Sequence, residues 1–125
     1  MTVLCWLCLG SNHGAANILP LAREMLTAAF PDIRFGTERI TRPVDFPTPA
    51  PFTNQIAYFR SFLSPEEIRK IFKGIESSCG RKAEDKARGI VRMDIDLLQH
   101  GDHVLKPRDM AYPHVEQGMR ELRHT

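Results

Sequence analysis

The sequence predicts an α+β protein built as a ferredoxin-like βαββαβ sandwich, in which helices pack on one face of an antiparallel sheet. Two observations indicate this fold class. Apolar residues recur with the spacing of a strand, a helix, two strands, a helix and a strand, in that order. The 125 residues, of which 42% are hydrophobic and 26% charged, suit one globular domain spanning residues 1–125.

The first half of the chain supplies four of these six elements. Residues 3–9 (VLCWLCL) form an apolar run with the length of a buried strand. A helix is expected over residues 16–30, where apolar side chains fall on one stripe and Pro31 follows as a stop. Strands are expected over residues 34–41 and 54–62, separated by a proline-rich loop.

The second helix carries the clearest start signal in the chain. Ser64 is expected to cap the helix, Pro65 to be its first residue and Glu67 its third, which is the pattern of a capping box. Gly80 is expected to end the helix. A polar loop over residues 81–89 then leads to the last strand.

That last strand, VRMDIDLL at residues 91–98, alternates between apolar and charged residues. One face would carry Val91, Met93, Ile95 and Leu97, and the other Arg92, Asp94 and Asp96. The two carboxylates would lie about 7 Å apart, so solvent, a basic neighbour or a metal ion is needed to offset their repulsion. A turn at residues 101–102 and a helical or irregular segment from His114 follow.

Composition narrows the classes of partner. The net charge of +2 gives no argument for binding nucleic acid or an anionic membrane. The longest apolar runs are far shorter than a membrane span, and the N-terminus lacks the basic region of a signal peptide. We therefore expect small-molecule partners, no nucleic acid, no membrane and a cytoplasmic location, whereas the oligomeric state is not predicted.

Three cysteines, an odd number, fit a reducing compartment better than a disulfide framework. Cys5 and Cys8 have the spacing of a redox or zinc motif. They lie inside a predicted strand, however, where residues three apart face opposite ways. The structural interpretation is therefore favoured over redox or zinc chemistry.

Asp94 and Asp96 are the most specific candidates for chemistry, because magnesium prefers carboxylate oxygens together with substrate phosphates. The residues just before them are rich in cations: Arg81, Lys82, Lys86, Arg88 and Arg92. This combination suits a magnesium–nucleotide site. The alternative is a solvated loop held by salt bridges.

Other candidates carry weaker signals. Phe52 and Asn54 could stack on and hydrogen-bond a heteroaromatic ligand, or Phe52 could belong to the core. His114 and Arg120 could contact phosphate or simply lie on the surface. Gly10-Ser11-Asn12 follows the first strand, but no phosphate-binding glycine motif is present, which favours a simple turn.

Five short motifs occur in a fixed order along most of the chain. They are LGSN at residues 9–12, Phe52-Thr53-Asn54, Ile75-Glu76 with Gly80-Arg81, Asp94-Ile95-Asp96-Leu97-Leu98, and Pro113-His114. With this set the chain resembles the 6-hydroxymethyl-7,8-dihydropterin pyrophosphokinase family from Leu9 to Arg120. The resemblance implies a βαββαβ fold and transfer of pyrophosphate from ATP to the hydroxymethyl group of the pterin in folate biosynthesis.

The resemblance also implies roles for individual residues. Asp94 and Asp96 would hold two Mg²⁺ ions that bridge the phosphates of ATP, the co-substrate. Phe52 would stack on the pterin and Asn54 would hydrogen-bond its ring. It further implies pterin contacts from Thr41, Pro43 and Val44, ATP contacts from Lys73, Glu76, Arg88, His114 and Arg120, and charge compensation by Arg81 and Arg92.

Four positions depart from the family pattern. Val91 stands where the family usually has an arginine, Arg88 where it has a tryptophan, and Ala83 where it has a second loop arginine. Leu122 stands where a second aromatic ring is expected. An active pyrophosphokinase is the favoured interpretation, ahead of a catalytically impaired relative that binds a nucleotide or pterin and of a scaffold without a ligand.

Overall fold

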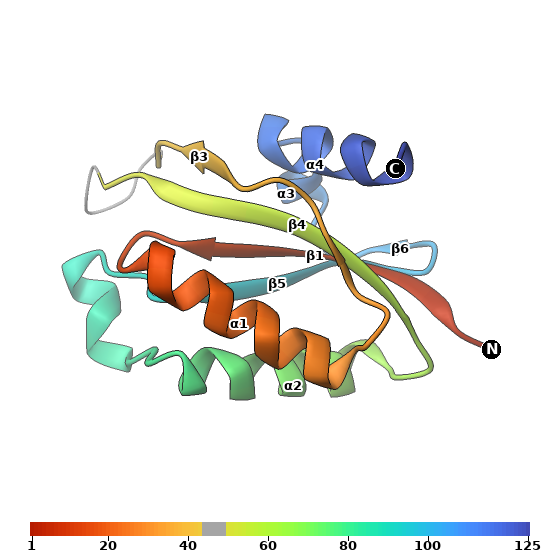
Figure 1. Cartoon of the computed structure of the whole chain (residues 1–125), viewed down its shortest axis with the longest axis horizontal. Coiled ribbons are helices and arrows are strands. Elements are labelled where there is room, and N and C mark those ends of the chain that lie inside the picture. The colour runs from red at the N-terminus through yellow and green to blue at the C-terminus, as the bar shows by residue number, and fades with distance from the viewer. Residues whose placement is uncertain (44–49) are drawn as a thin grey trace.

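The computed structural model describes residues 1–43 and 50–125 of the chain, so the predicted contact from Val44 lies outside the described residues. The strands are β1 (Val3–Ser11), β2 (Arg34–Phe35), β3 (Arg39–Thr41), β4 (Phe52–Ser61), β5 (Asp94–His100) and β6 (His103–Val104). They form one sheet in the order β2-β4-β1-β5-β6, with β3 also paired to β4, and every pairing is antiparallel (Figure 1).

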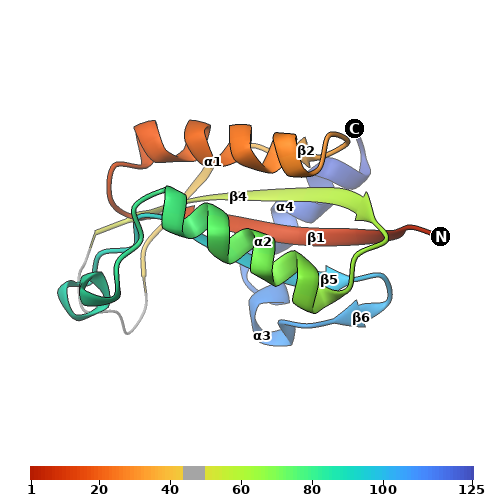
Figure 2. The ribbon, with the colours of Figure 1, turned by 90° about the horizontal axis from the view of Figure 1, so that it is seen from below.

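Two long helices, α1 (Ala15–Ala29) and α2 (Pro65–Ser78), lie side by side on one face of this sheet (Figure 2). This arrangement confirms the predicted ferredoxin-like fold class. The capping box at the start of α2 is also present. The backbone N–H of Glu67 donates to Ser64 Oγ at 3.2 Å, and the N–H of Ser64 donates to Glu67 Oε1 at 2.9 Å.

The main core fills the space between the sheet and these two helices. Strands β1 and β5 contribute their alternate residues, and α1, α2 and β4 contribute leucine, isoleucine and phenylalanine side chains. Its largest fully buried members include Leu7, Leu9, Leu19, Leu26, Phe59, Ile68, Phe72 and Leu97. Burying each such side chain contributes roughly 1.5–3 kcal/mol, so this layer carries most of the fold's hydrophobic stabilisation.

A second, smaller layer covers part of the opposite face. Helices α3 (Pro107–Met110) and α4 (Pro113–Arg123) lie there, above the sheet in Figure 1. The apolar cluster there joins Trp6, Ile56 and Leu98 of the sheet to Val115, Met119 and Leu122 of α4. A Cβ added to Gly118 would lie 2.3 Å from Ile56 Cγ1, so the backbone of α4 rests directly on β4 at that point.

Three local features differ from the sequence-based expectations. The strand expected over residues 34–41 is split into β2 and β3. The last strand begins at Asp94 rather than at residue 91, so Arg92 precedes it. The expected loop contains the 3₁₀ helix η1 (Ala83–Arg88).

The cysteines behave as the structural interpretation predicted. Cys5 packs in the main core, Cys8 lies on the other face of β1, and both are free thiols, as is Cys79. Among the described residues, no helix combines the length and apolar character needed to cross a bilayer.

Candidate active site

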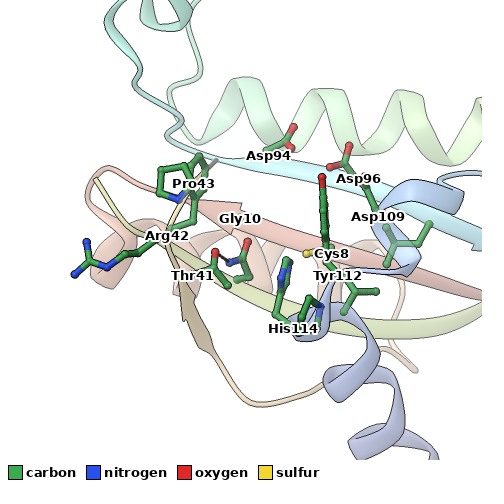
Figure 3. Close-up of a pocket in the computed structure, with 15 residues that line it drawn as sticks. Cys8, Gly10, Thr41, Arg42, Pro43, Asp94, Asp96, Asp109, Tyr112 and His114 are labelled. Carbon is green, nitrogen blue, oxygen red and sulfur yellow. Dashed lines mark hydrogen bonds between the residues drawn. The ribbon is translucent and has the colours of Figure 1, made fainter. Parts of the chain in front are cut away.

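A cavity of about 560 Å³ opens on the α4 side of the sheet, next to the part of that face which α4 leaves uncovered (Figure 3). Its walls come from the ends of β1, β3, β4 and β5 and from the segment joining α3 to α4. The lining residues are Cys8, Gly10, Thr41, Arg42, Pro43, Phe52, Asn54, Asp94, Asp96, Leu98, Asp109, Tyr112, Pro113, His114 and Val115. Residues far apart in the sequence therefore meet in one hollow.

Asp94 and Asp96 lie on one face of β5 because residues two apart on a strand point the same way. Their side chains are 40% and 32% exposed. Across the ladder, Asp94 pairs with Gly10 and Asp96 with Cys8. These small neighbours leave space beside the carboxylates. A Cβ on Gly10 would already lie 3.1 Å from Asn54 Oδ1, so a side chain there would crowd Asn54.

The environment of Asp96 disfavours its negative charge. Burial and the neighbouring charge of Asp94 raise the pKa of Asp96 to about 7, although Lys106 opposes this shift. Lys106 Nζ lies 3.8 Å from Asp96 Oδ1. Burial and the nearby Asp96 also raise the pKa of the Cys8 thiol well above its usual range, which disfavours the thiolate form. A cation between the two carboxylates would relieve this repulsion.

The donor set fits magnesium. Among the described residues, no group of three or more histidine, cysteine or acidic side chains could hold a metal ion on its own. The carboxylate pair would therefore share an ion with oxygens from a ligand and water. This is how Mg²⁺ is usually bound in sites that handle phosphates.

A second cavity, of about 230 Å³, lies between α2 and the open edge of β5 and shares Asp94 and Asp96 with the first. Apart from β5, its lining side chains are Arg69, Lys73, Glu76, Arg81 and Lys106. Four of these five residues are cationic. The smaller cavity is thus suited to a polyanion, whereas the larger one is lined mainly by neutral and apolar groups.

Arg81 and Glu76 connect this cationic cavity to the aspartate pair. Arg81 Nη1 donates to Asp94 Oδ1 at 2.8 Å and lies 3.2 Å from Glu76 Oε2. Glu76 Oε2 also accepts a hydrogen bond of 2.7 Å from the backbone N–H of Ile95, which faces the open edge of β5. Burial raises the pKa of Glu76, and the Ile95 N–H and Arg81 oppose that shift.

The other walls of the larger cavity bring together most of the predicted pterin contacts. Asn54 Nδ2 donates to Thr41 Oγ1 at 2.7 Å, which joins β4 to β3. Phe52 and Pro43 line the same cavity. His114 enters from α4, and its ring stacks on Tyr112 with centroids 5.8 Å apart. Burial lowers the pKa of His114, so the imidazole tends to be neutral.

Three predicted site residues lie outside both cavities. Arg92 Nε pairs with the buried Asp85 Oδ2 at 2.9 Å, because Arg92 precedes β5 instead of facing the aspartates from within it. Arg120 extends into solvent and lies 3.4 Å from Glu116. Arg88 is exposed at the end of η1.

The sequence suggested a simple turn at Asn12, but this residue also holds the loop that precedes β5. Its Nδ2 donates to Gly89 O at 2.8 Å, and its Oδ1 accepts from the N–H of Val91 at 2.7 Å. The backbone N–H of Asn12 also donates to Val91 O. The loop that carries Arg81 and Arg88 is therefore fixed to the end of β1.

Sequence reasoning missed several lining residues. Cys8 and Gly10 could have been found, because they alternate with the core residues of β1 and must face the same side as the aspartates. Tyr112 and Asp109 could not, since their positions depend on how α3 and α4 pack. Leu122, at the position expected for a second aromatic ring, is 6% exposed and packs from α4 against the sheet instead of lining the cavity.

Comparison with known proteins gives one family match, two similar relatives and one solved structure. A model of the 7,8-dihydro-6-hydroxymethylpterin-pyrophosphokinase family matches residues 6–123. The 2-amino-4-hydroxy-6-hydroxymethyldihydropteridine pyrophosphokinases of two Porphyromonas gingivalis strains are each 32% identical over 126 residues, covering 97% of this chain and 79% of the relative. A designed protein with a ferredoxin fold, solved by NMR, is 18% identical with a TM-score of 0.35, and the match covers 82% of this chain and 97% of that one.

Proposed function

Because the chain belongs to the 7,8-dihydro-6-hydroxymethylpterin-pyrophosphokinase family, we propose that it transfers pyrophosphate from ATP to the hydroxymethyl group of 6-hydroxymethyl-7,8-dihydropterin in folate biosynthesis. One observation carries the proposal beyond family membership. A mainly neutral cavity and a cationic cavity meet at Asp94 and Asp96. A two-substrate transfer between a neutral ring compound and a polyphosphate needs this arrangement.

The pterin would occupy the larger cavity. Phe52 offers a ring face for stacking, and Asn54 offers an amide that can both donate and accept hydrogen bonds. Thr41 holds the Asn54 amide through the 2.7 Å bond, which fixes the direction of its remaining donor and acceptor sites. Pro43 closes the wall next to Thr41. A ring bound there would direct its hydroxymethyl group toward the aspartate pair.

ATP would lie across the smaller cavity, with its phosphates among Lys73, Arg69, Arg81 and Lys106. Glu76 would hold Arg81 in place through their 3.2 Å contact. His114 lines the larger cavity, which the aspartate pair also lines, and its neutral imidazole could donate to a phosphate oxygen held near that pair. For Arg88, Arg92 and Arg120 to meet ATP, the loop or the side chain would have to move, because none of the three lines a cavity.

Asp94 and Asp96 would hold the magnesium ions that accompany ATP. The chemistry that Mg²⁺ would supply there is neutralisation of phosphate oxygens and orientation of the triphosphate for in-line attack. Displacement of Arg81 from Asp94 would free its guanidinium for a phosphate oxygen, where it offsets charge in the transition state.

The reaction itself needs positioning and charge compensation rather than a covalent intermediate. The acceptor hydroxyl oxygen forms a bond to the β-phosphorus of ATP. The bond from that phosphorus to the oxygen bridging the α- and β-phosphates breaks, AMP leaves, and the hydroxyl proton is released to solvent. The hydroxymethyl group becomes a diphosphate ester.

AMP formation tests the proposal directly. Purified protein should produce AMP only when ATP, Mg²⁺ and 6-hydroxymethyl-7,8-dihydropterin are all present. An Asp96→Asn variant should bind the pterin as the wild type does, yet form AMP far more slowly. AMP formation that persists without the pterin, or without a divalent cation, would contradict the proposal.

A second candidate function is binding without transfer, and the cation positions favour it. Val91 and Ala83 leave the loop without two arginines that the family pattern contains, and Arg92 is committed to Asp85. In that case calorimetry would show Mg²⁺-dependent nucleotide binding and pterin binding, but no AMP would form.

A further inference from the structure

Glu121 lies near the end of α4, outside both cavities, and accepts three hydrogen bonds, two from Thr37 between β2 and β3 and one from Arg39 at the start of β3. Its Oε2 accepts from Thr37 Oγ1 at 2.6 Å, and its Oε1 accepts from the backbone N–H of Thr37 at 3.0 Å. Arg39 Nη1 donates to the same Oε1 at 3.1 Å. A carboxylate held by three donors, one of them charged, is a strong and geometrically specific contact.

This contact coincides with the break in the strand that the sequence predicted over residues 34–41. The N–H of Gly36 still donates to Ile56 O on β4 at 2.8 Å, but the N–H of the next residue, Thr37, turns to Glu121. A Cβ on Gly36 would lie 3.0 Å from Glu121 Oε1, so the glycine makes room for the carboxylate. The local backbone is shaped to receive α4.

Both elements joined by this contact carry residues of the candidate site. Four residues after Thr37, Thr41 on β3 accepts the hydrogen bond from Asn54. Seven residues before Glu121, two helical turns away on the same face of α4, His114 lines the larger cavity. Between them, Gly118 brings the α4 backbone onto Ile56 without a side chain to set its orientation. The contacts of Glu121 therefore limit how α4 can pivot there.

The charge of Arg39 acts on both Glu121 and His114, which lie two turns apart on α4. Arg39 pairs with Glu121, and its positive charge also acts on His114, where it works with burial to lower the imidazole pKa. Asp109 is the other charged group that faces His114, and it acts in the opposite direction. Removing the Glu121 carboxylate would leave Arg39 uncompensated beside His114.

We propose that Glu121 is a positioning residue for the proposed reaction: by fastening α4 to the β2–β3 segment, it sets the place of His114 against Thr41 and Asn54 at the mouth of the cavity. The inference rests on the proposed function for its kinetic consequence. Its geometric consequence, the position and charge environment of His114, stands independently of catalysis.

The test compares Glu121→Ala and Glu121→Gln with two controls that remove exposed side chains which make no hydrogen bond or ion pair within the described part of the chain. Gln117→Ala lies on the same helix, and Glu24→Ala removes a carboxylate from α1. The kinetic constants kcat and KM for each substrate, and the pKa of His114 by NMR titration, are measured well below the unfolding midpoint of the least stable variant. The Tm of every variant is measured separately by thermal unfolding.

We expect Glu121→Ala to reduce kcat/KM on the order of tenfold, because small displacements of positioned groups are costly. The pKa of His114 should fall further, because Arg39 then acts without its partner. Glu121→Gln keeps an acceptor for Thr37 but loses the charge. Its kcat/KM should therefore lie between those of Glu121→Ala and the wild type, whereas the pKa of His114 should be lowered as in Glu121→Ala. The two controls should match the wild type in kcat/KM and in the pKa of His114.

A lower Tm with unchanged kcat/KM and an unchanged His114 titration would overturn the proposal, because Glu121 would then serve stability alone. Absence of AMP formation in the wild type would refute the proposed function instead. The NMR titration would in that case still decide whether Glu121 sets the environment of His114.

Discussion

The two faces of the sheet are built from the same strands but serve different purposes. On β1, Leu7 and Leu9 face α1 and α2, whereas Cys8 and Gly10 face the cavity. On β5, Leu97 faces the core and Asp96 faces the cavity. One face is closed by a continuous apolar layer, and the other is covered only in part by α4 and collects polar groups. Stability and chemistry are thus separated by the two-residue period of a strand.

This separation predicts its largest effect at the aspartate pair. Asp94→Asn or Asp96→Asn should reduce AMP formation by about a thousandfold or more, because the metal-holding charge is lost. Stability should change little, because the repulsion between the carboxylates is removed together with their partly exposed pairs to Arg81 and Lys106, which contribute little. Denaturant unfolding at pH 8 together with the AMP assay checks both statements.

The pH dependence sharpens that prediction. The pKa of Asp96 is raised on folding to about 7, so ionisation of Asp96 opposes folding as the pH rises from about 4 toward 8. Asp96→Asn should therefore be at least as stable as the wild type at pH 8, and this advantage should vanish near pH 4. If Asp96→Asn kept near-normal AMP formation, the assignment of Asp96 as a metal ligand would be wrong.

A substitution on the core face of the sheet should have the reverse effect, with a loss of stability and unchanged substrate binding. Leu7 is fully buried in the main core, and Leu7→Ala should cost about 2–5 kcal/mol of unfolding free energy through lost burial and a cavity. The fraction that stays folded should keep the wild-type KM for both substrates. A changed KM at full folding would mean that the two faces are not independent.

The two cavities can be separated in the same way, with a smaller effect. Phe52→Ala should raise the KM for the pterin up to about tenfold, as expected for the loss of an aromatic contact, and leave the KM for ATP nearly unchanged. Lys73→Ala should do the converse. Equal changes in both KM values for either variant would show that the cavities do not divide the substrates as proposed.

The contrast between faces also explains what the sequence could predict. Alternation along β1 and β5, the stripe on α2 and its capping box are local patterns, and each predicted its element and its buried side. The aspartate pair could be found because it is part of such a pattern. Tyr112, Asp109 and Lys106 reach the cavities only through the packing of the segment after β5. The pairing of Arg92 with Asp85 depends on a loop conformation that no period encodes.

The break between β2 and β3 shows the same limit. The sequence predicts a single strand over residues 34–41, and the backbone follows that expectation as far as Gly36. It is then interrupted by a carboxylate from a helix 84 residues further along the chain. Tertiary contacts of this kind override local propensity, and they lie on the α4 face, where the site is built.

The smallest predicted effect tests how firmly α4 is fastened on that face. Hydrogen bonds from Thr37, with help from Arg39, lower the pKa of Glu121 below its usual value. A depressed carboxylate pKa contributes stability that is present above the unfolded-state pKa and lost as the pH falls through the folded-state pKa. Glu121→Gln should therefore reduce the unfolding free energy by about 1 kcal/mol near neutral pH. The difference from wild type should shrink as the pH is lowered below about 4.

Urea unfolding of both proteins at several pH values measures this difference directly. If the difference stayed constant down to acidic pH, the charge of Glu121 would contribute nothing to fastening α4, and the neutral hydrogen bonds to Thr37 would account for the whole contact.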